Sequence, residues 1–177
     1  IIKRQGKGSE VRYLKDKEGG SEEALINRAL HGSKEEIDAI DMAYNFGPPT
    51  EIAQRKLGIS ASEIVLASNN VYFVKNVPVS HSFVQIPVKQ MNLLDVDLNS
   101  EKEISELIHH RIYDVAAHGK VSIKLIFAEE NVTSFLKIPL NTPILFFEEI
   151  LYNKSLEGIA RYKQYFIPDR YDLSFYL

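Results

Sequence analysis

The residues best suited to metal chemistry are an acidic run and a histidine pair. Asp95, Asp97 and Asn99 follow the Asp-x-Asp-x-Asn pattern that calcium-binding loops use. The run lacks the glycine at the sixth place and the glutamate at the twelfth that an EF-hand needs, so we interpret it as an ordinary acidic loop. His109 and His110 are adjacent in a predicted helix, where neighbouring side chains diverge by about 100°. We therefore expect no metal and no other cofactor.

Basic side chains at the start of the chain could bind phosphate. Residues 1–11 combine a basic strand, Gly-Lys-Gly and a returning strand, which predicts a hairpin. This hairpin would carry the basic side chains of Lys3, Arg4 and Lys7, which could contact the DNA backbone and minor groove. The alternative is a solvated basic terminus, because Gly-Lys-Gly is a short and unspecific pattern.

The composition limits the class of protein. The chain has 177 residues, of which 45% are hydrophobic and 25% charged, as in one soluble globular domain with a small appendage. A net charge of -3 argues against nucleic-acid binding by bulk electrostatics. The absence of cysteine excludes disulfides, thiol nucleophiles and cysteine-based zinc sites. We identify no signal peptide or membrane-spanning run and expect a cytoplasmic protein.

A linker and short helical segments follow the basic hairpin. Residues 13–20 are polar and end in Gly-Gly, which is typical of a linker. Ser21 is a suitable N-cap for an amphipathic helix that ends before Gly32. Ser33 is predicted to begin a helical turn that passes into a strand near Ala39.

The middle of the chain predicts a capped helix and a long hairpin. Thr50 caps a helix over residues 51–57, which ends at Gly58. The hairpin spans residues 63–87 and turns at Lys75-Asn76, because Asn76 tolerates a positive φ.

The following segments alternate between helix and strand. Residues 87–99 are predicted as a loop, and Asn99 or Ser100 caps a helix that runs to Ile112. A strand over residues 121–127 places Lys124 where it could reach an anionic ligand, although such a lysine is more often solvated. A helix then begins at Glu129-Glu130-Asn131 and runs to Leu136.

The last third of the chain predicts a strand pair. Pro143 marks the start of a strand that runs to Tyr152, because proline has no amide donor for a strand interior. After a turn at residues 153–155, a second strand spans residues 158–167 and alternates its side chains. One face carries Arg161, Lys163 and Tyr165, and the other carries Ala160, Tyr162, Gln164 and Phe166.

Together these segments resemble the UTRA effector-binding domain, which is found in the HutC branch of GntR-type bacterial transcriptional regulators. The resemblance rests on Leu-x-Ile-Pro-x-x-Thr-Pro-Ile-Leu at residues 136–145, the strand pair after it, and Asp-Arg-Tyr at residues 169–171. The helix capped by Thr50 and its hairpin fit the same order, and residues 1–11 resemble the wing of a winged helix-turn-helix. The similarity covers about residues 40–175.

This resemblance implies an α+β fold like that of chorismate lyase. A central antiparallel sheet of about six strands would be flanked by helices. Residues 1–12 would be the remnant of a wing, residues 13–34 a linker and short helix, and residues 35–177 the effector-binding domain.

The resemblance also implies an effector pocket. Two arginines that many family members carry on the first hairpin strand correspond to Asn70 and Tyr72, and a common acidic residue corresponds to Ser82. An amide and a phenol can orient a polar ligand but cannot neutralise a phosphate, so we expect a more neutral and aromatic pocket. His81 falls on the face opposite to the serines and is expected to be structural, and Gln85 is a further candidate contact. The predicted effector contacts are Asn70, Tyr72, Ser80, Ser82, Lys124, Tyr162 and Phe166.

Three functions are consistent with these patterns. The first is effector sensing by a homodimer, in which a sugar, sugar derivative or other metabolite alters operator binding by a winged helix-turn-helix that this sequence lacks. The second is a chorismate lyase-like enzyme, which the neutral residues at the arginine positions disfavour. The third is a ligand-free dimerisation module whose pocket is filled by its own Tyr and Phe side chains. We expect no catalytic residues.

Overall fold

The computed structural model describes residues 2–5 and 25–174, and for residues 2–5 the backbone alone. The strands are β1 (Ile2–Gln5), β2 (Ala39–Gly47), β3 (Val65–Val74), β4 (Val77–Pro87), β5 (His118–Phe127), β6 (Pro143–Tyr152) and β7 (Gly158–Phe166). The helices are α1 (Arg28–His31), α2 (Glu51–Leu57), α3 (Val88–Leu93), α4 (Glu101–Glu106), the π-helix η1 (Leu107–Arg111), α5 (Ile112–Val115), α6 (Glu130–Leu136) and the 3-10 helix η2 (Pro168–Arg170).

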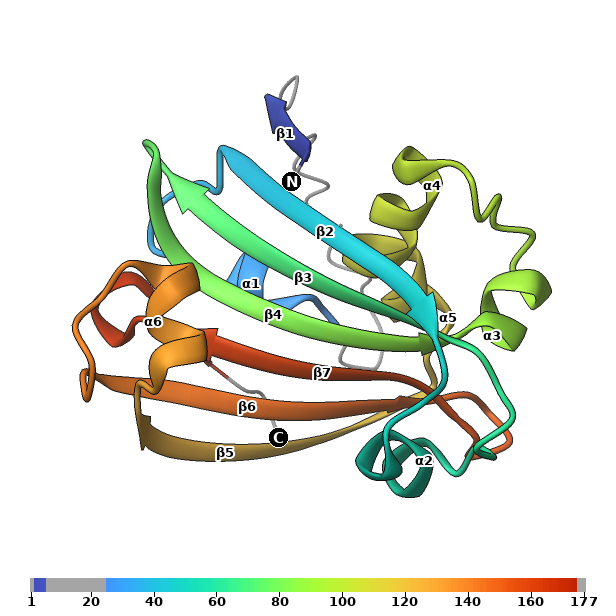
Figure 1. Ribbon diagram of the computed structural model, residues 1–177. Helices are drawn as coiled ribbons and strands as arrows, with labels where there is room; N and C mark the ends of the chain where they lie inside the picture. The colour runs from blue at the N-terminus through green and yellow to red at the C-terminus, as the bar shows by residue number, and fades with distance from the viewer. Residues whose placement is uncertain (1, 6–24, 175–177) are drawn as a thin grey trace, which may run out of the picture.

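The strands form one antiparallel sheet in the order β1-β2-β3-β4-β7-β6-β5 (Figure 1). The predicted α+β class, with an antiparallel sheet of about six strands flanked by helices, is confirmed. β1 adds a further edge strand, because Ile2–Gln5 pair with Ala39–Met42 of β2. The remainder of the predicted N-terminal hairpin, including Lys7, lies outside the described residues.

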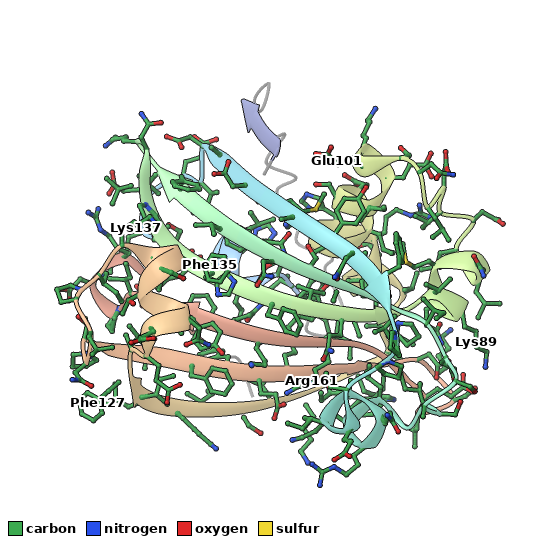
Figure 2. All side chains as sticks on the ribbon, viewed as in Figure 1. Lys89, Glu101, Phe127, Phe135, Lys137 and Arg161 are labelled. Carbon is green, nitrogen blue, oxygen red and sulfur yellow. The ribbon has the colours of Figure 1, made fainter. Side chains whose placement is uncertain are left out.

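Helices cover both faces of the sheet. We call the face under α1 and the α4-η1-α5 segment the inner face, and the face under α2 and α6 the outer face (Figure 1). On the inner face Ile104, Ile108 and Ile112 pack against strand residues that include Val84 and Tyr162. Side chains fill the space between these layers (Figure 2).

Several local signals act as predicted. The Thr50 hydroxyl accepts a hydrogen bond from the Ala53 amide at 3.2 Å, and α2 ends at Gly58 with φ +67°. Lys75 and Asn76 both have positive φ, 50° and 66°, as a two-residue hairpin turn that follows the twist of the strands requires. Pro143 is the first residue of β6.

Other segments differ from the sequence predictions. The segment predicted as a loop at residues 87–99 contains α3. The cap of α1 is Asn27 and not Ser21, because the Asn27 side chain accepts from the Ala29 amide. Ser33 does not begin a helical turn, since it forms an isolated bridge with Tyr171.

The helix predicted to end at Ile112 extends to Val115 and contains a π-helical stretch. Ser100 caps α4, and η1 continues it without a break into α5. Within η1, His109 is buried and His110 is exposed, so the two rings point to different environments. No helix among the described residues is long and apolar enough to span a membrane.

Candidate functional site

A buried polar network lies on the inner face at the centre of the β3-β4 hairpin. Alternate residues of a strand share a face, so Ser68, Asn70 and Tyr72 of β3 face the same side as Ser82 of β4. Asn70 Nδ2 donates to Ser82 Oγ at 3.4 Å, and Tyr72 Oη is 3.1 Å from Ser82 Oγ. All of these residues are fully buried.

Three residues from outside the hairpin complete this network. The His109 ring packs edge-on against the Tyr72 ring with centroids 5.8 Å apart, and Gln164 of β7 lies opposite Ser82. Burial raises the pKa of Tyr72 to about 12, against the lowering effect of hydrogen bonds from Ser82 and Asn27. We call the group the Tyr72 cluster. It consists of Asn27, Ser68, Asn70, Tyr72, Ser82, His109 and Gln164.

The C-terminal segment closes one side of the Tyr72 cluster. Tyr171 Oη donates to the carbonyl oxygen of Ala29 in α1 at 2.8 Å, because that carbonyl can only accept. The Ser80 hydroxyl also contacts Tyr171 Oη and must then donate to it. The Phe166 ring packs against Tyr171 with centroids 4.7 Å apart. Ser80 and Phe166 therefore border the cluster.

A buried ion pair lies beside the Tyr72 cluster and ties α1 to the sheet. Arg28 Nη1 is 3.0 Å from Glu149 Oε1 of β6, and Tyr113 Oη donates to Glu149 Oε2 at 3.2 Å. The Glu149 side chain is 1% exposed, and burial raises its pKa although Arg28 and Tyr113 lower it. Tyr162 Oη donates to the Ile108 carbonyl oxygen at 2.8 Å.

Six of the seven predicted effector contacts therefore lie together on or beside the inner face. The exception is Lys124, whose position in β5 is opposite Phe146 of β6. Phe146 packs on the outer side with Tyr165, so Lys124 points away from Tyr72 and is exposed. The grouping of Lys124 with the other contacts is wrong, because strand alternation gives it the opposite face.

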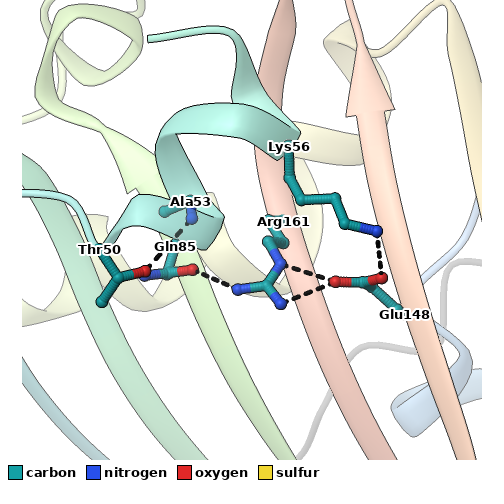
Figure 3. Close-up of polar contacts among 6 residues, drawn as sticks. All are labelled: Thr50, Ala53, Lys56, Gln85, Glu148 and Arg161. Carbon is teal, nitrogen blue, oxygen red and sulfur yellow. Dashed lines mark hydrogen bonds and ion pairs between the residues drawn. The ribbon is translucent and has the colours of Figure 1, made fainter. Parts of the chain in front are cut away.

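The outer face carries a separate polar network (Figure 3). Arg161 donates to Gln85 Oε1 at 2.8 Å and from two nitrogens to Glu148 Oε1, while Lys56 of α2 binds the second oxygen of Glu148 at 2.8 Å. Gln85 is thus engaged on the face opposite to the Tyr72 cluster. Its role as an effector contact at that cluster is not supported by this geometry.

His81 also lies on the outer face. Its ring stacks on Phe135 of α6 with centroids 4.0 Å apart, and Nε2 is 3.0 Å from Asn69 Oδ1. Burial, with a smaller effect from Lys163, lowers the pKa of His81 to about 4. A neutral, stacked histidine fits the predicted structural role.

Two surface clefts occur near α2 and α3, away from the Tyr72 cluster. One of about 440 Å³ is lined by residues such as Ile64 and Leu93, and one of about 480 Å³ by residues such as Arg55 and Lys89. Neither lining includes a predicted effector contact. Among the described residues, no group of three side chains is arranged to hold a metal ion.

Sequence reasoning missed four members of the cluster. Ser68 lies two residues before Asn70 on β3, so strand alternation could have placed it on the same face. Gln164 alternates with Tyr162 and Phe166 on β7, so the strand period could have placed it at the site. Asn27 and His109 had no such signal, because their places depend on how α1 and η1 pack on the sheet. Of the predicted DNA contacts, Lys3 and Arg4 lie in β1, and Lys7 lies outside the described residues.

The fold is an α+β domain built on one antiparallel sheet, and it encloses a polar network between the sheet and its inner helices. The family model of the UTRA domain matches residues 42–172. The chain therefore belongs to the UTRA domain family.

Solved structures share this fold. A GntR-family transcriptional regulator from Enterococcus faecalis V583 superposes with a TM-score of 0.69 at 14% identity, over 78% of this chain and 99% of that one. The ligand-binding domain of a GntR-family transcriptional regulator from Bordetella bronchiseptica superposes with a TM-score of 0.63 at 14% identity, over 82% of this chain and 94% of that one. The effector domain of PhnF from Mycobacterium smegmatis superposes with a TM-score of 0.62 at 16% identity, over 78% of this chain and 88% of that one. No curated protein matches the sequence significantly.

Proposed function

We propose that this chain is the effector-binding domain of a bacterial transcriptional regulator of the GntR type and the HutC branch. The observation that carries the proposal is the UTRA family match over residues 42–172. The ligand-binding and effector domains named among the similar structures support it at the level of fold. A role at operator DNA places the protein in the cytoplasm, where bacterial DNA is located.

The proposed effector site is the Tyr72 cluster with its neighbours Ser80, Tyr162 and Phe166. A small molecule that binds one arrangement of the domain more tightly than another shifts the population between them. α1 is the element through which such a shift reaches the start of the chain, because it contacts the cluster through Asn27 and the sheet through Arg28. The coupled output is a change in operator affinity.

A ligand-free dimerisation module is the second candidate function. The observation that favours it is the complete burial of Asn70, Tyr72, Ser82 and Tyr162 beneath α1 and the α4-η1-α5 segment. An enzymatic role is less well supported. The charged groups beside the cluster, Arg28 and Glu149, are engaged with each other.

DNA binding tests the proposed role. We expect the complete gene product to bind the DNA upstream of its gene specifically, and the 177-residue chain to bind it at least about 10³-fold more weakly, which is the range of non-specific binding. Fluorescence anisotropy with a scrambled DNA control measures both affinities. A metabolite that stabilises the chain should change the affinity of the complete product by about 5–150-fold. Tight, specific DNA binding by the 177 residues alone would disprove the assignment of residues 1–12 as a wing remnant.

We also propose that the chain forms a homodimer, and that the β5 edge contributes to it. β5 is the last strand of the sheet and carries Ile123, Leu125 and Phe127 on one side, with 52%, 66% and 61% of their surface exposed. Figure 2 shows Phe127 at this free edge. An exposed apolar edge strand is a natural template for pairing with a second copy about a two-fold axis.

Replacing Leu125 with glutamate is expected to convert the dimer to a monomer, because a charge at this edge would be buried on pairing. Size-exclusion chromatography with light scattering measures the mass. The matched control is Leu156→Glu, since Leu156 is 69% exposed in the β6-β7 turn, at the opposite end of β5 from Leu125. A dimer that persists in Leu125→Glu would show that β5 does not form the interface.

A further inference from the structure

Three buried polar atoms in the Tyr72 cluster have no hydrogen-bond partner among the described residues. They are Gln164 Oε1, Gln164 Nε2 and His109 Nε2. Gln164 is only 1% exposed and His109 only 3%. Leaving a buried donor or acceptor without a partner is costly, and native proteins rarely do so without a water or a ligand to satisfy it.

The hydrogen bonds of His109 fix the character of its unpartnered nitrogen. Nδ1 lies 2.7 Å from the Ser105 carbonyl oxygen, which can only accept, so Nδ1 carries the proton. Burial lowers the pKa of His109 to about 4, and the ring is therefore neutral at pH 7. Nε2 is then an acceptor, and what binds there must donate a hydrogen.

The side chains that carry the unpartnered atoms all lie close to Tyr72. Gln164 is opposite Ser82, whose hydroxyl is 3.1 Å from Tyr72 Oη. His109 packs on the Tyr72 ring, and Asn27 lies within hydrogen-bonding range of the same tyrosine. The Gln164 carboxamide, with a free donor and a free acceptor, and the neutral acceptor of His109 thus lie around Tyr72, whose hydroxyl Asn27 already contacts.

The charged groups beside the Tyr72 cluster, Arg28 and Glu149, already pair with each other. The Arg28 guanidinium and the Glu149 carboxylate are 3.0 Å apart, and Tyr113 also donates to the carboxylate. An anionic ligand would have to compete with Glu149 for Arg28, and a cationic ligand would have to compete with Arg28 for Glu149. Burying a charge without a partner is strongly unfavourable, so the site selects an uncharged molecule.

We propose that the effector is an uncharged planar molecule with an amide-like edge, such as a lactam or a nucleobase. The inference rests on the function proposed above and names the ligand class of the same site. The Gln164 carboxamide pairs with the adjacent donor and acceptor of that edge, as glutamine does with the edge of a base. A second ligand N–H donates to His109 Nε2. The Tyr72, Tyr162 and Phe147 rings provide flat apolar surfaces for such a molecule.

Binding requires α1 to shift. Neither surface cleft reaches the Tyr72 cluster, and α1 is the shortest covering element, with four residues. It is held over the cluster by the Arg28 ion pair and by the bond from Tyr171 to Ala29. The ligand therefore acts on the segment that leads toward the start of the chain.

Thermal unfolding with matched probes tests the proposal. The probes are uracil and nicotinamide, each compared with its carboxylate counterpart, orotate and nicotinate, and hypoxanthine as a larger uncharged base. We expect an uncharged probe at about 100 times its Kd to raise the Tm by on the order of 5–10 °C and its carboxylate partner to have little effect. Equal or larger shifts with the carboxylates, or no shift with any uncharged probe, would overturn the proposal.

Two variants remove the recognising atoms and retain the shape of the side chains. Gln164→Leu and His109→Phe are expected to lose the ligand-induced shift, while His81→Phe, a matched buried histidine on the outer face, keeps it. Gln164→Leu should also raise the Tm of the unliganded protein, because it removes two unpartnered polar atoms. A shift that survives in both cluster variants, or a large loss of unliganded stability in Gln164→Leu, would contradict the assignment.

The outcomes separate this inference from the proposed function. If a carboxylate probe binds and alters the DNA affinity of the complete gene product, the ligand class is wrong and the sensor role stands. If no probe, charged or uncharged, changes either the Tm or the DNA affinity, the sensor role fails as well.

Discussion

Replacing Glu149 with leucine is expected to lower the free energy of unfolding by about 3–5 kcal/mol. The change leaves the Arg28 guanidinium in a site where its side chain is only 12% exposed, without the carboxylate that lies 3.0 Å away. It also removes the acceptor of the Tyr113 hydroxyl, which is itself buried. Urea denaturation followed by circular dichroism measures the loss.

The control for this variant is Glu35→Gln. Glu35 also forms ion pairs, with Lys75 at 2.7 Å and Arg170 at 3.2 Å, but at the surface, where such pairs contribute only about 0–1 kcal/mol. The double variant Arg28→Met with Glu149→Leu should recover much of the stability, because neither charged group then remains buried. Equal losses for Glu149→Leu and Glu35→Gln would refute the importance of this buried pair.

Gly158→Ala is expected to destabilise the protein by about 2–3 kcal/mol. A β-carbon at Gly158 would lie 2.8 Å from the Leu57 carbonyl oxygen and 2.9 Å from the Leu57 Cα. These are backbone atoms at the end of α2, so the clash cannot be relieved by a side-chain rotation. Either α2 moves away from β7 or β7 distorts, and the urea midpoint should fall accordingly.

Gly47→Ala is the matched control for this effect. Gly47 is also a strand glycine, at the end of β2, but no atom lies within 4 Å of the position that its β-carbon would take. The substitution should change stability by at most about 0.5–1 kcal/mol, in the stabilising direction because alanine has less freedom when unfolded. If Gly158→Ala were as mild as Gly47→Ala, the close approach of α2 to β7 would be incorrect.

The parts of the fold that depend on neighbours in the sequence could be predicted. The cap at Thr50, the left-handed Gly58, the turn at Lys75-Asn76 and the start of β6 at Pro143 are all set by the conformational limits of single residues. The two faces of β7 follow from strand alternation, and this correctly separated Tyr162 from Arg161.

The parts that depend on distant contacts could not be predicted. Ser33 looks like a helix cap, but it bridges to Tyr171, and the next amide, that of Lys34, donates to the Arg170 carbonyl. The π-helical stretch that turns His109 inward has no local signature, because its extra residue per turn depends on packing against the sheet. α3 was missed because its apolar pattern is too short to distinguish from a loop.

The same division applies to the candidate site. Strand alternation and family resemblance placed six of the predicted contacts together. Lys124 was grouped with them from its position in the predicted strand over residues 121–127, whose register against β6 puts it on the opposite face. That Asn27 and His109 close the cluster could not be predicted, because their positions depend on how α1 and η1 pack on the sheet.

The bond from Tyr171 to Ala29 joins residues 142 positions apart in the chain. Further backbone bonds, from the Asp172 amide to Gly32 and from the Lys34 amide to Arg170, fasten the same two segments. A pull applied to the residues just ahead of α1 is therefore shared between the sheet, through Arg28 and Glu149, and the C-terminal segment, through Tyr171. α1 and the C-terminal segment resist such a pull together.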